Sequence, residues 1–153
     1  MPWHPFLVHF PLALLVVAGL AYLASLRSPD PFWARSGYLL HLAGLAGLVL
    51  ATLSGRQAEA GLVMTEAIRE LLQTHELMGY GTLWAFALLL VWRYLGVKKP
   101  QSLTAWAFGL VFWAMIGLMA WGGWYGGRLV YQEGAGVAPM RPHLEQQLKP
   151  DSP

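Results

Sequence analysis

Four long runs of apolar residues dominate the hydrophobic pattern of this chain, and shorter polar stretches separate them. The runs are residues 6–26, 36–54, 77–95 and 103–122. About 20 residues of helix cross the hydrocarbon core of a bilayer, and each run is close to that length. Arg93 lies near the end of the third run, where its long side chain can reach the headgroups. The pattern predicts an all-α, polytopic membrane protein with four transmembrane helices in an up-and-down bundle.

The connections between the runs differ in length. Residues 27–35 and 96–102 are short and contain prolines, so they predict tight turns. Residues 55–76 form a longer connection, and within it residues 65–72 carry apolar side chains at helical spacing. This spacing predicts a short amphipathic segment before the third helix, at the membrane interface.

The sequence divides into two parts. Residues 1–137 contain all four apolar runs and are predicted to form one transmembrane domain. Residues 138–153 are predicted to be an irregular tail, because Pro139, Pro142, Pro150 and Pro153 interrupt them.

Basic residues are distributed unevenly between the two sets of connections. The short connections and the adjoining run ends hold one acidic residue, Asp30, and the basic residues Arg27, Arg35, Arg93, Lys98 and Lys99. Basic residues in short connections favour the cytoplasmic side, so both chain termini are expected outside. A cleavable signal peptide is the alternative for the first run, but a basic start and a small-residue cleavage site are absent.

Composition supports the membrane class and excludes several others. Hydrophobic residues make up 56% of the chain and charged residues 12%, too few to solvate the outside of a globule. The basic residues form no stripe, which argues against nucleic acid as a partner. The absence of cysteine excludes thiolate metal sites, iron–sulfur clusters and covalent haem attachment by this chain.

Three of the five histidines are predicted to meet at the outer rim. His4 and His9 lie at the outer end of the first run, and His75 opens the third. His4 precedes Pro5, which places His4 at a helix cap. The first and third helices of such a bundle are diagonal partners, so His9 and His75 can face each other across the core with a metal or haem iron between them. The helix N-termini favour neutral imidazoles that can act as ligands.

The other two histidines are expected elsewhere. His41 lies about one turn into the second run from the cytoplasmic side, and His143 is a solvated tail residue.

Small and aromatic residues near the rim fit a flat ligand. Gly79 follows His75 by one turn and would leave space beneath it. The fourth run repeats small and aromatic residues at every fourth position: Gly109, Trp113, Gly117 and Trp121. The same spacing is also a common device for close packing of membrane helices, so both interpretations stay open.

The segment 122–131 leaves the bilayer beside these histidines. Its glycines are expected to end the fourth helix, and Tyr125 belongs either to an interfacial aromatic belt or to a rim over the site. Arg56 or Arg128 could pair with an acidic group such as a haem propionate. Three acidic residues on the same side could complete a metal site or relay protons: Glu59, Glu66 and Glu76.

Two segments resemble the signatures of a known family. Residues 4–12 read HPFLVHFPL and residues 126–137 read GGRLVYQEGAGV. They resemble a bacterial four-helix integral-membrane family catalogued as domain of unknown function 2231. The resemblance covers residues 1–137, includes a histidine opening the third span as His75 does, and leaves out His41. It implies location in the bacterial inner membrane. Relatives joined to Rieske-type or c-type cytochrome modules imply respiratory electron transfer with such partner proteins.

The preferred functional hypothesis is an electron-transfer subunit that binds b-type haem near the outer face. His9 and His75 are its expected axial ligands, and His4 is the substitute ligand. Arg56 and Arg128 are the expected propionate partners, and Gly79, Trp121 and Tyr125 are expected to surround the haem. A quinol could approach from the lipid, and a homo-oligomer is left open.

Two alternatives come from other classes. His4, His9 and His75 could hold copper or zinc in a metal-binding or assembly factor, or the protein could be a purely structural subunit. The chain is more easily interpreted as a redox carrier than as a stand-alone enzyme, since no nucleophile, base and orienting group occur at recognisable spacing. A transporter is disfavoured because no internal repeat is apparent across the four runs.

Overall fold

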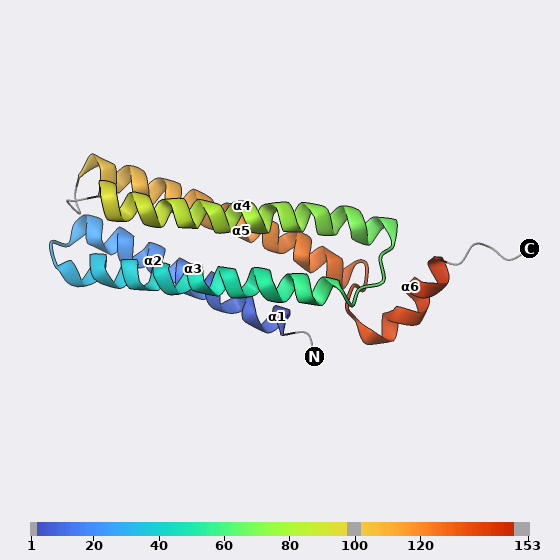
Figure 1. The fold of residues 1–153 in the computed structure, drawn as a ribbon. Helices are drawn as coiled ribbons and strands as arrows, with labels where there is room; N and C mark the ends of the chain where they lie inside the picture. Colours follow the sequence, from blue (N-terminus) through green and yellow to red (C-terminus); the bar gives the residue numbers. More distant parts are fainter. Residues whose placement is uncertain (1–2, 98–101, 149–153) are drawn as a thin grey trace, which may run out of the picture.

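The structure is a computed structural model that describes residues 3–97 and 102–148, and this part is helical without strands (Figure 1). The helices are α1 (His4–Leu7), α2 (His9–Arg27), α3 (Pro31–Glu59), α4 (Glu66–Gly96), α5 (Leu103–Tyr131), the 3-10 helix η1 (Ala138–Met140) and α6 (Arg141–Gln147). The all-α prediction is confirmed. The middle of the expected turn at 96–102, with Lys98, Lys99 and Pro100, lies outside the described residues, as does the chain after 148.

Polar side chains set the start of each long helix after α2. Asp30 accepts a hydrogen bond from the Phe32 amide at 2.9 Å, and Pro31 occupies the first turn of α3. Such caps satisfy amide hydrogens that have no partner within the helix. Thr65 and Ser102 cap α4 and α5 in the same way.

Three helical stretches are long and apolar enough to cross a membrane, namely His4–Arg27, Pro31–Glu59 and Leu103–Tyr131. Helix α4 has 31 residues but is not among them. Its first turns carry Glu66, Arg69 and Glu70, and Arg93 lies near its end, which lowers its mean hydropathy. The membrane-protein class is thus supported by three candidate spans, identified by length and hydropathy.

Helices α2 and α3 form one antiparallel hairpin, and α4 and α5 form a second (Figure 1). Helix α2 packs on α3 and α5, and α4 packs on α5 and α3, so α2 and α4 are diagonal partners. The core between the hairpins is rich in aromatic rings, and Phe86 and Phe112 are fully buried. The histidine hypothesis assumes that the helix with His9 and the helix with His75 are diagonal partners, and α2 and α4 have this relationship.

His41 lies in the middle of this core and not near a helix end. Helix α3 begins at Pro31, so His41 is about 15 Å along its axis. The imidazole is 0% exposed, and its Nε2 lies 3.0 Å from the carbonyl oxygen of Phe86. Its Nδ1 lies 3.4 Å from the Tyr22 hydroxyl. The expected position about one turn into the helix is wrong because α3 begins at Pro31, earlier than the apolar run.

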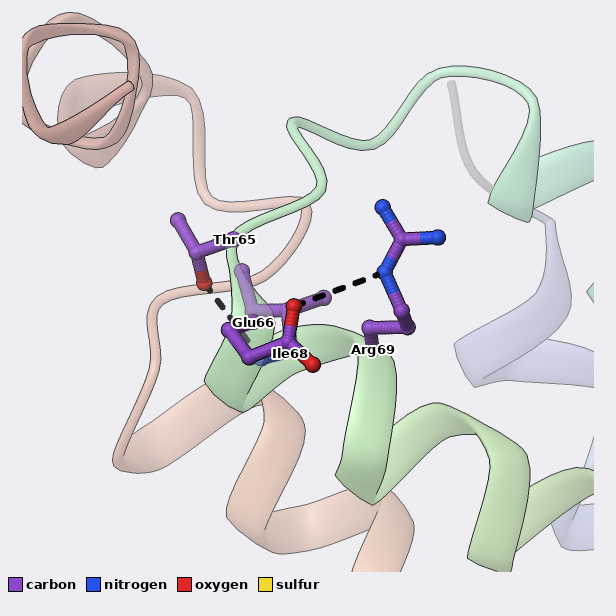
Figure 2. A network of polar contacts seen from close by, with 4 residues as sticks. All are labelled: Thr65, Glu66, Ile68 and Arg69. Carbon is purple, nitrogen blue, oxygen red and sulfur yellow. Dashed lines mark hydrogen bonds and ion pairs between the residues drawn. The ribbon is translucent and has the colours of Figure 1, made fainter. Parts of the chain in front are cut away.

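The expected separate amphipathic segment at 65–72 is instead the beginning of α4. Thr65 Oγ1 accepts a hydrogen bond from the Ile68 amide at 3.3 Å, and Glu66 and Arg69 form an exposed ion pair at 3.9 Å (Figure 2). Ile68 is 0% exposed and packs in a cluster with Leu129, while the chain continues as one helix. The apolar side chains of this segment thus pack against protein, whereas contact with the membrane interface was expected.

The tail also differs from the irregular expectation, because η1 and α6 occupy residues 138–147. Pro139 and Pro142 lie in the first turns of these helices, where no amide hydrogen is needed. Gly134 and Gly136, with φ of 67° and 74°, turn the chain back toward the bundle. Leu144 is consequently buried in the cluster with Ile68. The domain boundary at 137 stays a prediction.

Candidate functional site

A cavity of about 660 Å³ opens at the end of the bundle that carries α1. Residues from α1, α2, α3, α4 and α5 line it, together with residues 135–137. Most of its wall is apolar, and its polar residues include three of the five histidines. The volume is within the range of about 300–1,000 Å³ that is usual for small-molecule and cofactor sites.

His4 reaches into this cavity from α1 and is held by α3. Its Nδ1 lies 2.9 Å from the carbonyl oxygen of Ala51 and 3.1 Å from Oγ of Ser54. A carbonyl oxygen can only accept, so Nδ1 carries the hydrogen. In the neutral ring the Nε2 lone pair is then available to a ligand.

His75 repeats this arrangement from the second hairpin. Its Nδ1 lies 2.9 Å from the carbonyl oxygen of Gly122 on α5, so the same nitrogen carries the hydrogen. The ring is half-buried, as is that of His4, and the two imidazoles are close enough to interact electrostatically. Helices α1 and α4 thus bring two oriented imidazoles to one cavity.

Glycines leave room beside both rings. A Cβ atom on Gly55 would lie 3.1 Å from Cε1 of His4, and one on Gly126 would lie 2.9 Å from Cε1 of His75. Helix α5 therefore runs through its glycines to Tyr131 instead of ending at them, since close packing against α4 stabilises the helix there.

His9 lies at the edge of the cavity. It begins α2, lines the cavity and is exposed, and no hydrogen bond from its ring is found within the described structure. Across residues 3–97 and 102–148, no three His, Asp or Glu side chains converge as a ready metal-ion site. His4 and His75 therefore have rings held by hydrogen bonds, whereas His9 lines the same cavity without such a bond within the described structure.

The remaining predicted site residues divide into two groups. Gly79 and Arg56 line the cavity, and a Cβ on Gly79 would meet nothing within 4 Å. Trp121, Tyr125 and Arg128 are not among the lining residues. Arg128 instead donates to the Gln132 side chain at 2.7 Å and lies over the Tyr125 ring.

Two carboxyl groups meet at the rim. Partial burial raises the pKa of Glu76 from its ordinary value, and the neighbouring Glu59 raises it further by charge repulsion and a shared hydrogen bond. Arg56 and His75 act in the opposite direction. The pair therefore holds a proton more tightly than an isolated Glu would. Glu66, the third acidic residue considered, pairs with Arg69 and does not line the cavity.

The groups that orient the imidazoles were not predicted from the sequence, namely the Ala51 and Gly122 carbonyls and the glycines Gly55 and Gly126. A backbone acceptor has no signature in a sequence. A usable signal exists nevertheless, because each histidine precedes its glycine by the same 51 positions.

The fold and site define a helical membrane protein with a histidine-bearing cavity at one end of the bundle. The chain belongs to the family described as Predicted membrane protein (DUF2231), whose model matches residues 1–139. The resemblance drawn from the two sequence signatures is thereby confirmed. No curated protein and no solved structure matches the chain.

Proposed function

We propose that this protein is a membrane-embedded electron-transfer subunit that binds one b-type haem between His4 and His75. A single observation carries the proposal: two imidazoles from α1 and α4, each with Nδ1 bound to a carbonyl, share one largely apolar cavity. Metal-ligating histidines commonly use such a bond to fix the ring and expose the other nitrogen.

The number of ligands favours haem over a bare metal ion. A structural zinc site needs about four protein ligands, and copper electron-transfer sites usually need at least three. A porphyrin already supplies four nitrogens, so two axial imidazoles complete its iron. Bound haem would supply a one-electron iron couple, while the apolar wall excludes water and sets the surrounding dielectric. His4 replaces His9 as the proposed partner of His75.

Arg56 is the proposed partner of a haem propionate. It lines the cavity and is exposed at the rim, where a guanidinium can bind a carboxylate without being buried. Arg128 is withdrawn from this role because its side chain is engaged by Gln132 and Tyr125 outside the cavity.

We further propose that α4 is the fourth crossing. It lies antiparallel between two apolar helices, and Trp84, Leu88 and Val91 on its middle turns are 67%, 67% and 53% exposed. Apolar side chains facing outward at that depth fit lipid better than water. Arg27 and Arg35 then mark the opposite end as cytoplasmic, and the cavity lies at the outer face of a bacterial inner membrane. A reporter fused after residue 148 should be active outside, and cytoplasmic activity would contradict this orientation.

Partner proteins follow from the same proposal. The cavity lies beside the outer face in this orientation, so a Rieske-type or c-type cytochrome on that side is the proposed redox partner class. A quinol from the lipid is the proposed alternative electron donor.

The test is an optical spectrum of the detergent-purified protein made in haem-replete cells. We expect a Soret band, and sharp bands on reduction that are typical of two axial imidazoles. Preparations without a Soret band, even after haem is added to the apo-protein, would rule the proposal out.

A further inference from the structure

The environment of His4 recurs around His75 in the same register. His4, Ala51 and Gly55 in the first hairpin correspond to His75, Gly122 and Gly126 in the second. Each residue of the second set lies 71 positions after its counterpart, and both histidines are 47 residues from their acceptor. The recurrence involves the ring, its acceptor and the glycine behind it.

The same register of 71 positions extends through the core. The rings of His41 and Phe112 are 5.0 Å apart, and the Arg93 guanidinium lies 5.6 Å from the Tyr22 ring. In each pair the second residue is 71 positions after the first. Residues related by a two-fold rotation approach each other where they lie near its axis. These pairs therefore trace an axis between the two hairpins.

Burial follows the register as well. Leu15 and Phe86, 71 positions apart, are both 0% exposed. Leu26 and Val97 are also 71 positions apart, and both are buried. Both hairpins start at the cavity end of the bundle, so the axis runs along the bundle and the repeats are parallel (Figure 1).

We propose that the bundle is a duplicated helical hairpin, and that Gly55 and Gly126 are positioning residues that seat two equivalent imidazoles for one ligand on the shared axis. The identity of that ligand as haem rests on the function proposed above, whereas the duplicated set of histidine, carbonyl acceptor and glycine does not. In the first half the ring comes from α1, which leads into α2, and the carbonyl and glycine come from α3; in the second half the ring comes from α4, and the carbonyl and glycine come from α5.

The glycines act by leaving room. An alanine Cβ at position 55 would be tighter against the His4 ring than about nine in ten real contacts, and one at position 126 would be closer to the His75 ring than real Cβ atoms come, so the ring must move. The hydrogen bond from Nδ1 to the backbone carbonyl fixes the ring. Movement of the ring therefore weakens this hydrogen bond, so that the hydrogen is no longer held on Nδ1. The contact is tighter at position 126, at 2.9 Å against 3.1 Å, so Gly126→Ala should have the larger effect.

The repeat is not exact, so the environments of the two histidines can be distinguished. Ser54 Oγ gives His4 a second partner at 3.1 Å, and the corresponding position in the second hairpin is Tyr125. Ser54→Ala should therefore change the signals of His4 and leave those of His75 unchanged.

The first experiment uses the haem-free full-length protein with ¹⁵N-labelled histidine in detergent micelles. Long-range ¹H–¹⁵N spectra at pH 8 should show His4 and His75 with hydrogen on Nδ1, and His41 with hydrogen on Nε2. Finding hydrogen on Nε2 of His4 or His75 overturns the proposal. This measurement on the unmodified protein decides the matter even where a glycine variant does not fold.

The second experiment compares Gly55→Ala and Gly126→Ala with Gly79→Ala and Gly123→Ala. All four glycines line the cavity, but a Cβ at 79 or 123 meets nothing within 4 Å. Each of the first two variants should shift only its own histidine, and the controls should shift neither. Equal spectra for the two groups overturn the positioning role.

Haem titration separates this inference from the proposed function. The haem affinity of Gly55→Ala and Gly126→Ala should fall on the order of 10- to 100-fold, the usual effect of changing a group that orients a ligand. If neither the parent protein nor any variant binds haem, while the tautomers and shifts appear as stated, the duplicated histidine sites are supported and the haem assignment fails.

Discussion

His41 donates its Nε2 hydrogen to the carbonyl oxygen of Phe86, 3.0 Å away, in the centre of the bundle. His4 and His75 bond carbonyls through the opposite nitrogen, Nδ1, beside an open cavity. Because Tyr22 faces the remaining nitrogen of His41, that ring is satisfied within the core. The choice of nitrogen and the presence of a cavity thus separate a packing histidine from two candidate ligands.

His41 is accordingly expected to serve stability. His41→Ala should lower the free energy of unfolding by about 3 kcal/mol, since it leaves a void among Phe86 and Phe112. Thermal unfolding in detergent measures this change. The folded fraction should bind haem as the parent does, and loss of haem without loss of stability would assign His41 to the site.

The two proposed ligands should be separable from His9 by substitution. His4→Ala and His75→Ala should each abolish the bis-imidazole spectrum, because one axial position is then vacant. Added imidazole should restore the spectrum by occupying the vacancy. His9→Ala and the tail control His143→Ala should keep the parent spectrum. A variant pattern in which His9 is required and His4 is dispensable would return the role to His9.

The docked tail gives a prediction with a matched control. Leu144 is 6% exposed, whereas Leu148 is 53% exposed four residues later. Leu144→Ala should weaken docking of α6 by about 2 kcal/mol, and a glutamyl endopeptidase should then cut after Glu145 in α6 faster. Leu148→Ala should leave the rate unchanged. Equal rates for the parent and Leu144→Ala would show that the tail is held by other contacts.

The carboxyl pair predicts a pH dependence of stability. The pKa of Glu76 is raised above its ordinary 4.5 in the folded state, so ionisation costs more there than in the unfolded chain. The folded protein therefore loses stability from this group as the pH rises above about 4.5. Glu76→Gln removes the ionisable group and should be more stable than the parent at pH 7, with a smaller difference at pH 4. Glu66→Gln, at an exposed ion pair, is the control.

Hydrophobic periodicity and length alone determined the helical class, the four apolar runs and the meeting of His4, His9 and His75 at one end of the bundle. These features depend on local composition and on the alternation of direction in a chain of long helices. The diagonal relation of α2 and α4 followed from the same alternation. The observed helices extend beyond the apolar runs because capping residues and packing, not hydropathy, set their ends.

Tertiary structure decided which groups orient the rings of His4 and His75 and how the tail docks, because only packing between helices brings these groups together. The acceptors are backbone carbonyls of Ala51 and Gly122, which no side-chain pattern reveals. The repeat escaped sequence inspection because its members differ in type, as Tyr22 and Arg93 do, and become recognisable only where they meet across the axis.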